Sequence, residues 1–208
     1  MGILPHSPWS RVGAVDCPDR KKFQGQGYCG VMPRVIVKLP TFNGEMVSHE
    51  TGMIGELRAL IASQRVATLG TIGDDGSAFV SMVPFALEPV LGCLVIHVSE
   101  LAAHTGNLLA RPKISLLVMQ AEVPGEPVHA LPRVTLEGFA TVLEPHSHAW
   151  QRCRAVYLQR FPEAAPMTQL GDFKFVAVAI KGARQVSGFA VARSINEEGV
   201  KRALVQAI

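Results

Sequence analysis

Closely spaced cysteine pairs, which mark zinc sites and disulfide-rich secreted domains, are missing from this sequence. Its four cysteines are Cys17, Cys29, Cys93 and Cys153, and no two of them have Cys-x-x-Cys spacing. Cys93 and Cys153 lie inside apolar patterns, as reduced core cysteines do. We therefore expect free thiols and a cytoplasmic protein.

Long apolar runs are missing as well. No stretch approaches the length of about 18 consecutive apolar residues that a membrane-spanning helix needs. Residues 1–11 carry Pro5, His6 and Pro8 where a signal peptide has a basic region followed by an apolar one. We therefore expect neither a signal peptide nor a membrane partner.

A large excess of charge of either sign is also missing. The chain has 20 basic and 17 acidic residues, a net charge of +3, and its longest basic run is Arg20-Lys21-Lys22. A nucleic-acid-binding domain gathers many more positive charges on one face. We therefore expect no nucleic-acid partner.

What the sequence has in abundance is apolar residues, which make up 48% of its 208 positions. That is enough for one domain with a large core. Residues 1–48 lack regular apolar periodicity, and we interpret them as a loosely ordered arm. Residues 49–195 carry the pattern of a folded domain, and residues 196–208 are expected to form a polar tail.

The spacing of the apolar residues predicts three helices and six or seven strands. We expect helices over residues 52–64, 101–110 and 146–160, and strands over residues 66–72, 78–84, 93–98, 113–120, 133–144, 173–180 and 184–191. Residues 73–76, Gly-Asp-Asp-Gly, predict a hairpin turn, because Asp-Gly readily adopts positive φ. So few helices between strands favour a mainly β fold, an antiparallel barrel with flanking helices. Strands that are apolar on both faces, such as 93–98 and 173–180, predict a homodimer that covers them.

Two polar side chains interrupt the apolar face of the helix expected at 101–110. On a helical wheel of about 100° per residue, His104 and Thr105 share a face with Leu101 and Leu108. A buried imidazole or hydroxyl needs a hydrogen-bond partner, so this face meets either polar backbone or a ligand. Ser99, just before the helix, is expected to cap it.

Short motifs inside these elements recur in a recognisable order. They lie at residues 65–71, 75–76, 81–85, 99–108, 111–117, 133–138 and 171–173, and the most specific is the His-Thr-x-Asn-Leu sequence that starts at His104. Together they resemble the FMN-binding split-barrel proteins related to pyridoxamine 5′-phosphate oxidase, and within them the haem-utilisation (HugZ-like) branch. The resemblance covers roughly residues 50–195. It implies a six-stranded antiparallel split β-barrel and a homodimer with FMN at the subunit interface.

The resemblance also implies which residues hold the FMN. In this family one barrel strand and the helix after the third strand approach the ribityl phosphate, and the last barrel strand approaches the flavin from the partner chain. Carried over residue by residue, the expected site is Ser81, Met82, Val83, Pro84, Ser99, His104, Thr105, Asn107, Gly188 and Arg193. Hydroxyls, an imidazole and helix N-terminal N–H groups suit a phosphate chemically.

Departures from the family pattern narrow the expected function. Pyridoxamine oxidases have adjacent basic residues in the helix and an arginine in the preceding strand, where this chain has Ala103, His104 and Ser81. Their C-terminal Arg-x-His is matched only by Arg193-Ser-Ile, so vitamin B6 oxidation is not expected. The haem-degrading relatives carry a further C-terminal domain with a haem-ligating histidine, which this sequence does not include.

Two functions fit these patterns. The first is an FMN-dependent oxidoreductase of unknown substrate, acting with a small-molecule substrate or electron acceptor, in which the flavin does the chemistry. No side chain is an obvious general acid or base, so the catalytic residues are unknown. The second is a non-catalytic flavin- or haem-binding module of the haem-utilisation type. A metal site is not expected, because His146 and His148 lack a third ligand nearby.

Overall fold

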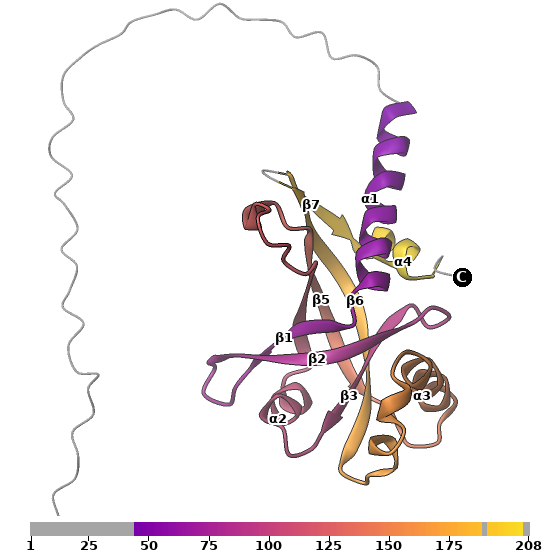
Figure 1. The fold of residues 1–208 in the computed structure, drawn as a ribbon. Coiled ribbons are helices and arrows are strands. Elements are labelled where there is room, and N and C mark those ends of the chain that lie inside the picture. The colour runs from indigo at the N-terminus through magenta and orange to yellow at the C-terminus, as the bar shows by residue number, and fades with distance from the viewer. Residues whose placement is uncertain (1–43, 189–190, 206–208) are drawn as a thin grey trace, which may run out of the picture. The chain divides into compact units, whose positions relative to one another are not determined.

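Seven antiparallel strands make up one sheet in the part of the chain that the computed structural model describes, which is residues 44–188 and 191–205 (Figure 1). Their order across the sheet is β3-β2-β1-β4-β5-β6-β7, and β3 also pairs with β6. The strands are β1 (Val66–Ile72), β2 (Ala78–Glu88), β3 (Cys93–Ser99), β4 (Lys113–Met119), β5 (Arg133–Val142), β6 (Phe173–Gly188) and β7 (Val191–Asn196). The pairing of β3 with β6 closes the first six strands into a barrel. This confirms the predicted six-stranded antiparallel barrel with flanking helices, while the homodimer stays a prediction.

The hairpin turn predicted between the first two strands has the expected chemistry. Gly76 has a φ of 82°, and its N–H donates to the carbonyl of Gly73 over 3.0 Å. The Asp75 carboxylate accepts a 2.9 Å hydrogen bond from the N–H of Ser77. Turn formation therefore explains the paired aspartates.

The last barrel strand differs from the expectation of two strands at 173–180 and 184–191. Strand β6 runs without a break through Gly182, which pairs with Glu137 on one side and Asn196 on the other. The ladder between β5 and β6 shifts register at Gly138, where an added Cβ would lie 2.6 Å from the carbonyl oxygen of Ala179. A side chain at 138 would thus force the two strands apart. β6 is long enough to close the barrel with its first half and to carry β7 on its second.

Two helices depart from the prediction, one in its start and one in its presence. Helix α1 (Gly44–Ser63) begins ahead of the expected start at residue 52, so residues 44–48 are helical although the sequence assigns them to the arm. Helix α4 (Glu197–Val205) occupies most of the expected polar tail. Its buried residues Val200, Ala203 and Leu204 recur at helical spacing and pack with α1 and β6. The division into an arm, a domain and a tail stays a prediction, with residues 1–43 outside the described part.

The other two α-helices lie against the barrel wall. Helix α2 (Ala103–Ala110) contacts β1, β2 and β5, and helix α3 (His148–Arg160) contacts β2, β3 and β6. Ser147 caps α3 by accepting a hydrogen bond from the N–H of Trp150. The connecting loops in the described part of the chain contain three 3₁₀ turns, η1 (Val128–Ala130), η2 (Pro162–Ala164) and η3 (Met167–Gln169). Within the described residues no helix combines the length and apolar character needed to cross a membrane.

Two apolar clusters form the core. The larger one fills the barrel and extends under α1 and α4. The smaller one lies between the barrel wall and α3, and it contains Cys93, Cys153, Tyr157, Phe161 and Phe175. Cys93 and Cys153 are buried free thiols, as predicted, whereas Cys17 and Cys29 lie outside the described residues.

Candidate functional site

The four site residues expected on β2 point to opposite faces of the barrel wall. Ser81 lies opposite the fully buried Leu69, and Val83 lies opposite the buried Ala67, so both face the barrel interior. Met82 and Pro84 lie between them and face outward, with Met82 63% exposed. A ligand on the outer face would therefore meet the side chain of Met82, but not that of Ser81. The buried Ser81 Oγ has no hydrogen-bond partner among the described residues.

On helix α2, Thr105 meets backbone, one of the two alternatives that the sequence leaves open. Its side chain is fully buried, and its Oγ1 donates a 2.6 Å hydrogen bond to the carbonyl of Ser99. Ser99 is not the cap of α2, whose first flanking residue is Ala102 and makes no side-chain cap. The Ser99 hydroxyl instead accepts from the N–H of Leu101 and donates over 3.0 Å to the Asp172 carboxylate. These hydroxyls therefore hold the turn between β3 and α2 in place.

Asn107 is also engaged inside the protein. Its Nδ2 donates a 3.1 Å hydrogen bond to the Thr71 hydroxyl at the end of β1. Leu101, expected on the same apolar face as Leu108, lies before the helix begins and is almost fully exposed.

His104 differs from its neighbours on α2, because its ring makes no hydrogen bond within the described part of the chain. It is half-buried, and desolvation lowers the pKa of its imidazole below the ordinary value of 6.5. The ring is therefore neutral at pH 7, which is the form that binds transition metals. His104 lies one helical turn before Asn107, so both lie on the same side of the helix.

The remaining two expected residues lie far along the sheet from α2. Gly188 ends β6 and pairs with Val191, and Arg193 lies opposite Gln185 on β7. Figure 1 shows β7 at the opposite end of β6 from α2. Within one chain, the structure brings together Ser99, His104, Thr105 and Asn107, but not Gly188 and Arg193. A role for these two in the partner's site stays a prediction.

The group around α2 is a poor match for a phosphate within a single chain. Its hydroxyls already donate to protein acceptors. The acceptor of the Ser99 hydroxyl is the Asp172 carboxylate, whose negative charge repels an anion. Arg111, at the end of α2, binds the side chain and carbonyl of Asp74 over 2.9 Å and 3.2 Å. Among the described residues no cation is therefore aimed at this group, and they do not by themselves form an FMN phosphate site.

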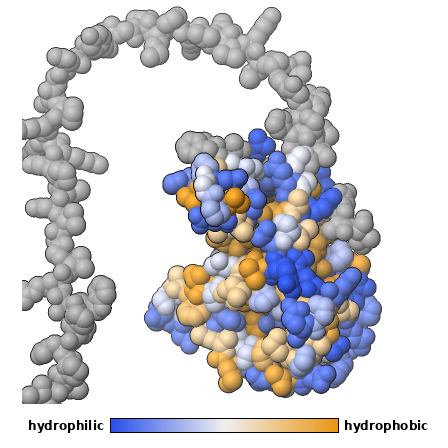
Figure 2. All heavy atoms as spheres, in the orientation of Figure 1, coloured by the Kyte–Doolittle hydropathy of each residue, from blue (hydrophilic) through white to orange (hydrophobic). Residues whose placement is uncertain are grey.

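A second feature, to which Met82 among the expected site residues belongs, is an uncovered apolar face on the outside of the barrel. Outward-facing side chains of β1, β2, β4 and β5 are exposed here, among them Val66, Ile72, Val80, Met82, Met119 and Phe139. Figure 2 shows apolar atoms exposed where β1 and β2 cross the front of the molecule. The resemblance placed a ligand near Ser81 to Pro84, whereas a covered surface was predicted from strands 93–98 and 173–180, of which 93–98 is buried within this chain.

This outer face contains a groove of about 400 Å³. Gly70 lies in its floor, between Val80 on β2 and Ser115 on β4. A Cβ at position 70 would lie 2.7 Å from the Ser115 Oγ, so glycine keeps the floor of the groove low. Thr71 also lines the groove, and its buried side chain, which faces the barrel interior, accepts the hydrogen bond from Asn107, so helix α2 is joined to the wall of the groove.

A family model and two named relatives match this chain. The family model for pyridoxamine 5′-phosphate oxidase matches residues 53–187. The chain is 35% identical over 141 residues to the chloroplastic heme oxygenase HOZ of Arabidopsis thaliana, which covers 67% of this chain and 41% of that protein. It is 26% identical over 142 residues to the heme oxygenase HutZ of Vibrio cholerae, covering 68% of this chain and 80% of HutZ.

A solved structure agrees with these matches. The heme binding protein from Mycobacterium smegmatis superposes with a TM-score of 0.65 at 29% identity, over 72% of this chain and 60% of that one. This chain thus spans about two fifths of the plant relative and three fifths of the mycobacterial one. The family match covers well over half of the chain and agrees with the barrel built above, so this protein belongs to the pyridoxamine 5′-phosphate oxidase family of split barrels.

Proposed function

We propose that this protein binds haem on the outer face of its barrel and takes part in haem breakdown. The observation that carries the proposal is the exposed apolar face with its groove, in a chain whose relatives are named heme oxygenases and a heme binding protein. Haem is a flat, largely apolar ring system, and binding sites for such molecules are concave and mostly apolar. The poor phosphate match around α2 favours haem over FMN.

The groove offers both kinds of contact that a haem needs. Val80, Ile72 and Phe79 supply apolar surface, and Lys113 supplies a positive charge for a propionate group. Glu137 also lines the groove, so the propionates would lie on the Lys113 side. Haem bound here would supply the iron and the ring that is oxidised, and the protein would position it and limit access of water.

His104 is the candidate iron ligand among the described histidines. It is half-buried on α2, the helix that Asn107 joins to the groove residue Thr71, is neutral at pH 7 and makes no hydrogen bond within the described residues. His97, in contrast, is buried and stacked among aromatic rings. Neutral imidazole is a common haem ligand.

Adding hemin to the purified protein is expected to give a Soret band that saturates at a fixed ratio of hemin to protein. His104→Ala should shift or abolish that band, whereas His148→Ala, an exposed histidine at the start of α3, should leave it unchanged. With a reductant and oxygen added, the Soret band should decay as a ring-opened tetrapyrrole forms. A spectrum of unbound hemin throughout the titration would contradict the proposal.

A second candidate is the FMN-dependent oxidoreductase, which the match to the pyridoxamine 5′-phosphate oxidase family favours. FMN rather than haem would then lie between two copies of the barrel, held in part by side chains of the second copy. Titration of the same protein with FMN and with riboflavin separates the candidates. Saturable quenching of FMN fluorescence, together with weak hemin binding, would support the flavin enzyme.

We also propose that a second copy of the chain covers the apolar face. Obligate interfaces of this kind bury on the order of 2,000 Å² or more, and an apolar ligand between two copies would be shielded from water. Met82→Glu, at a 63% exposed position in the middle of the face, is expected to convert a dimer into a monomer in sedimentation at micromolar concentration. Val90→Glu, 60% exposed in the turn between β2 and β3, is the matched control and should remain dimeric. A monomeric wild type would exclude this arrangement.

A cytoplasmic location stays a prediction.

A further inference from the structure

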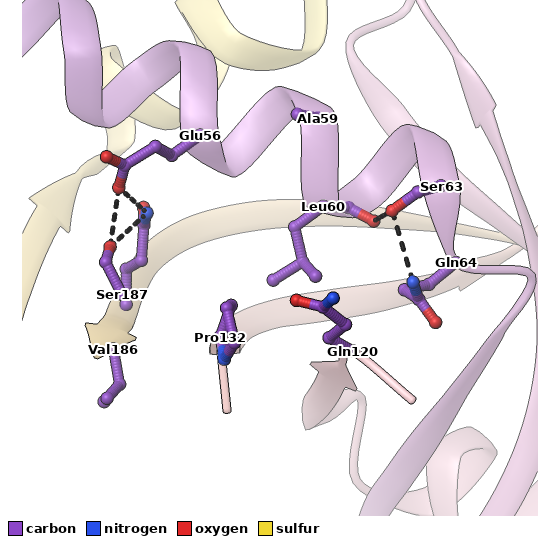
Figure 3. A pocket seen from close by; sticks show the side chains of 10 residues that line it. Glu56, Ala59, Leu60, Ser63, Gln64, Gln120, Pro132, Val186 and Ser187 are labelled. Atoms are coloured by element: carbon purple, nitrogen blue, oxygen red, sulfur yellow. Dashed lines mark hydrogen bonds between the residues drawn. The ribbon is translucent and has the colours of Figure 1, made fainter. Parts of the chain in front are cut away.

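A cleft of about 470 Å³ lies between helix α1 and the ends of strands β4, β5 and β6 (Figure 3). Its middle part is apolar, formed by Ala59 and Leu60 of α1 with Pro132 and Val186, and the polar residues Ser63, Gln64 and Gln120 line one end. It shares no lining residue with the groove on the outer face. A ligand here would therefore be independent of the haem proposal.

A polar cluster lies at one end of the cleft. The amide Nε2 of Gln185 donates to Glu56 Oε2 and to Ser187 Oγ, both over 3.0 Å, and the Ser187 hydroxyl donates to the same Glu56 oxygen over 2.6 Å. Figure 3 shows Glu56 reaching down from α1 to Ser187. The cluster therefore ties α1 to the end of β6 through a single carboxylate oxygen.

The same cluster leaves hydrogen-bond acceptors without donors. Gln185 is 4% exposed, yet its Oε1 has no partner among the described residues. Reversing the amide would not help, because it would place the Gln185 oxygen against the Glu56 carboxylate. Glu56 Oε1 also accepts no hydrogen bond within the described residues, but Glu56 is exposed, so water can reach that oxygen. A buried acceptor without a donor costs about 1–3 kcal/mol, so such groups in native proteins usually have a partner that the chain alone does not supply.

The charge of the residues that line the cleft indicates which kind of hydrogen-bond donor would suit the unpaired oxygen of Gln185. Glu56 is the charged residue among those that line it, and none of the described lining residues is a Lys or an Arg. Unpaired acceptors beside a carboxylate bind a positively charged N–H donor best, since charge-assisted hydrogen bonds are the stronger ones. Beyond the cluster, the apolar middle part extends along α1 as far as Leu60, a rise of about 6 Å from Glu56 at 1.5 Å per residue.

We propose that this cleft binds a small organic ammonium ion, with the ammonium group at Glu56 and Gln185 and an alkyl chain of about six carbons along Leu60 and Pro132, which matches the rise of about 6 Å from Glu56 to Leu60 at 1.5 Å per residue. The ammonium group donates to Gln185 Oε1, which satisfies that buried acceptor, and to the exposed carboxylate oxygen Oε1 of Glu56. Replacing the ammonium by a neutral hydroxyl keeps the chain contacts but loses the charge.

The test is calorimetric titration of the full-length protein with hexylammonium, 1-hexanol and hexanoate. Hexylammonium should bind saturably, 1-hexanol at least tenfold more weakly, and hexanoate not at all. Glu56→Gln should weaken hexylammonium binding by about ten- to a hundredfold, the effect of one charged hydrogen bond. Glu126→Gln removes the same charge from an exposed loop position and should change nothing.

Two further measurements keep the result interpretable. Ala59→Phe fills the cleft from α1 without touching the polar cluster and should also abolish binding. Thermal unfolding of each variant checks that the fold is retained. Equal affinities for hexylammonium and 1-hexanol, unchanged binding by Glu56→Gln and Ala59→Phe, or no saturable binding of hexylammonium would each overturn the proposal.

Discussion

Replacing Arg152 with alanine is expected to lower the free energy of unfolding by about 3 kcal/mol, because it leaves a buried carboxylate without its cation. Glu88, at the end of β2, has a fully buried side chain. Its Oε1 accepts hydrogen bonds from the Nε and Nη2 of Arg152 on α3, over 3.1 Å and 2.6 Å. Its other oxygen accepts from the N–H of Leu91. The pair therefore fixes α3 over the smaller core.

Urea unfolding monitored by circular dichroism measures this loss. Lys181→Ala is the matched control, since Lys181 forms an ion pair with Glu197 at the same 2.6 Å distance but on the surface. Exposed pairs contribute about 0–1 kcal/mol, so this control should lose little. The double variant Glu88→Leu/Arg152→Leu should be more stable than Arg152→Ala, because it removes the buried charge together with its partner. Equal small losses in Arg152→Ala and Lys181→Ala would show that the buried pair is not a strong clamp.

The wild-type protein is expected to lose about 3 kcal/mol of stability through His97 alone as the pH falls from 7 to 4. His97 lies in β3, with its ring 4.3 Å from that of Phe175 and 5.0 Å from that of Phe173, measured between centroids. Burial lowers the pKa of its imidazole from 6.5 to about 4. Between these values the unfolded chain binds a proton that the folded chain does not. Stability is therefore lost as the pH falls through this window.

His97→Leu removes this proton linkage. Its free energy of unfolding should depend less on pH than that of the wild type between pH 7 and pH 4, although it loses aromatic contacts at neutral pH. His148→Leu, at an exposed histidine, should keep the wild-type dependence. Tyr157, which also packs on His97, stays neutral in this range, because burial raises its pKa to about 12. Parallel pH curves for the wild type and His97→Leu would rule out His97 as the source.

The barrel could be predicted from the sequence because local patterns specify it. Strands 66–72 and 93–98 were placed nearly to the residue by their apolar runs, and Asp75-Gly76 specified the turn. The continuous strand β6 was missed because Gly182 is a usual turn signal, and only pairing on both sides keeps it extended. Helix α4 was missed because its apolar positions are few, and their burial depends on α1.

The sequence by itself determined the family, the barrel and the presence of a polar pair on the helix after β3. Only the tertiary structure decided which partners those groups have. Thr105 meets the carbonyl of Ser99, and Glu88 meets Arg152, 64 positions along the chain. The unpaired Oε1 of Gln185 is likewise set by Glu56, 129 positions away. Hydrogen bonds and ion pairs act over a few ångströms in space, so their partners follow from how distant segments pack, which spacing along the chain does not encode.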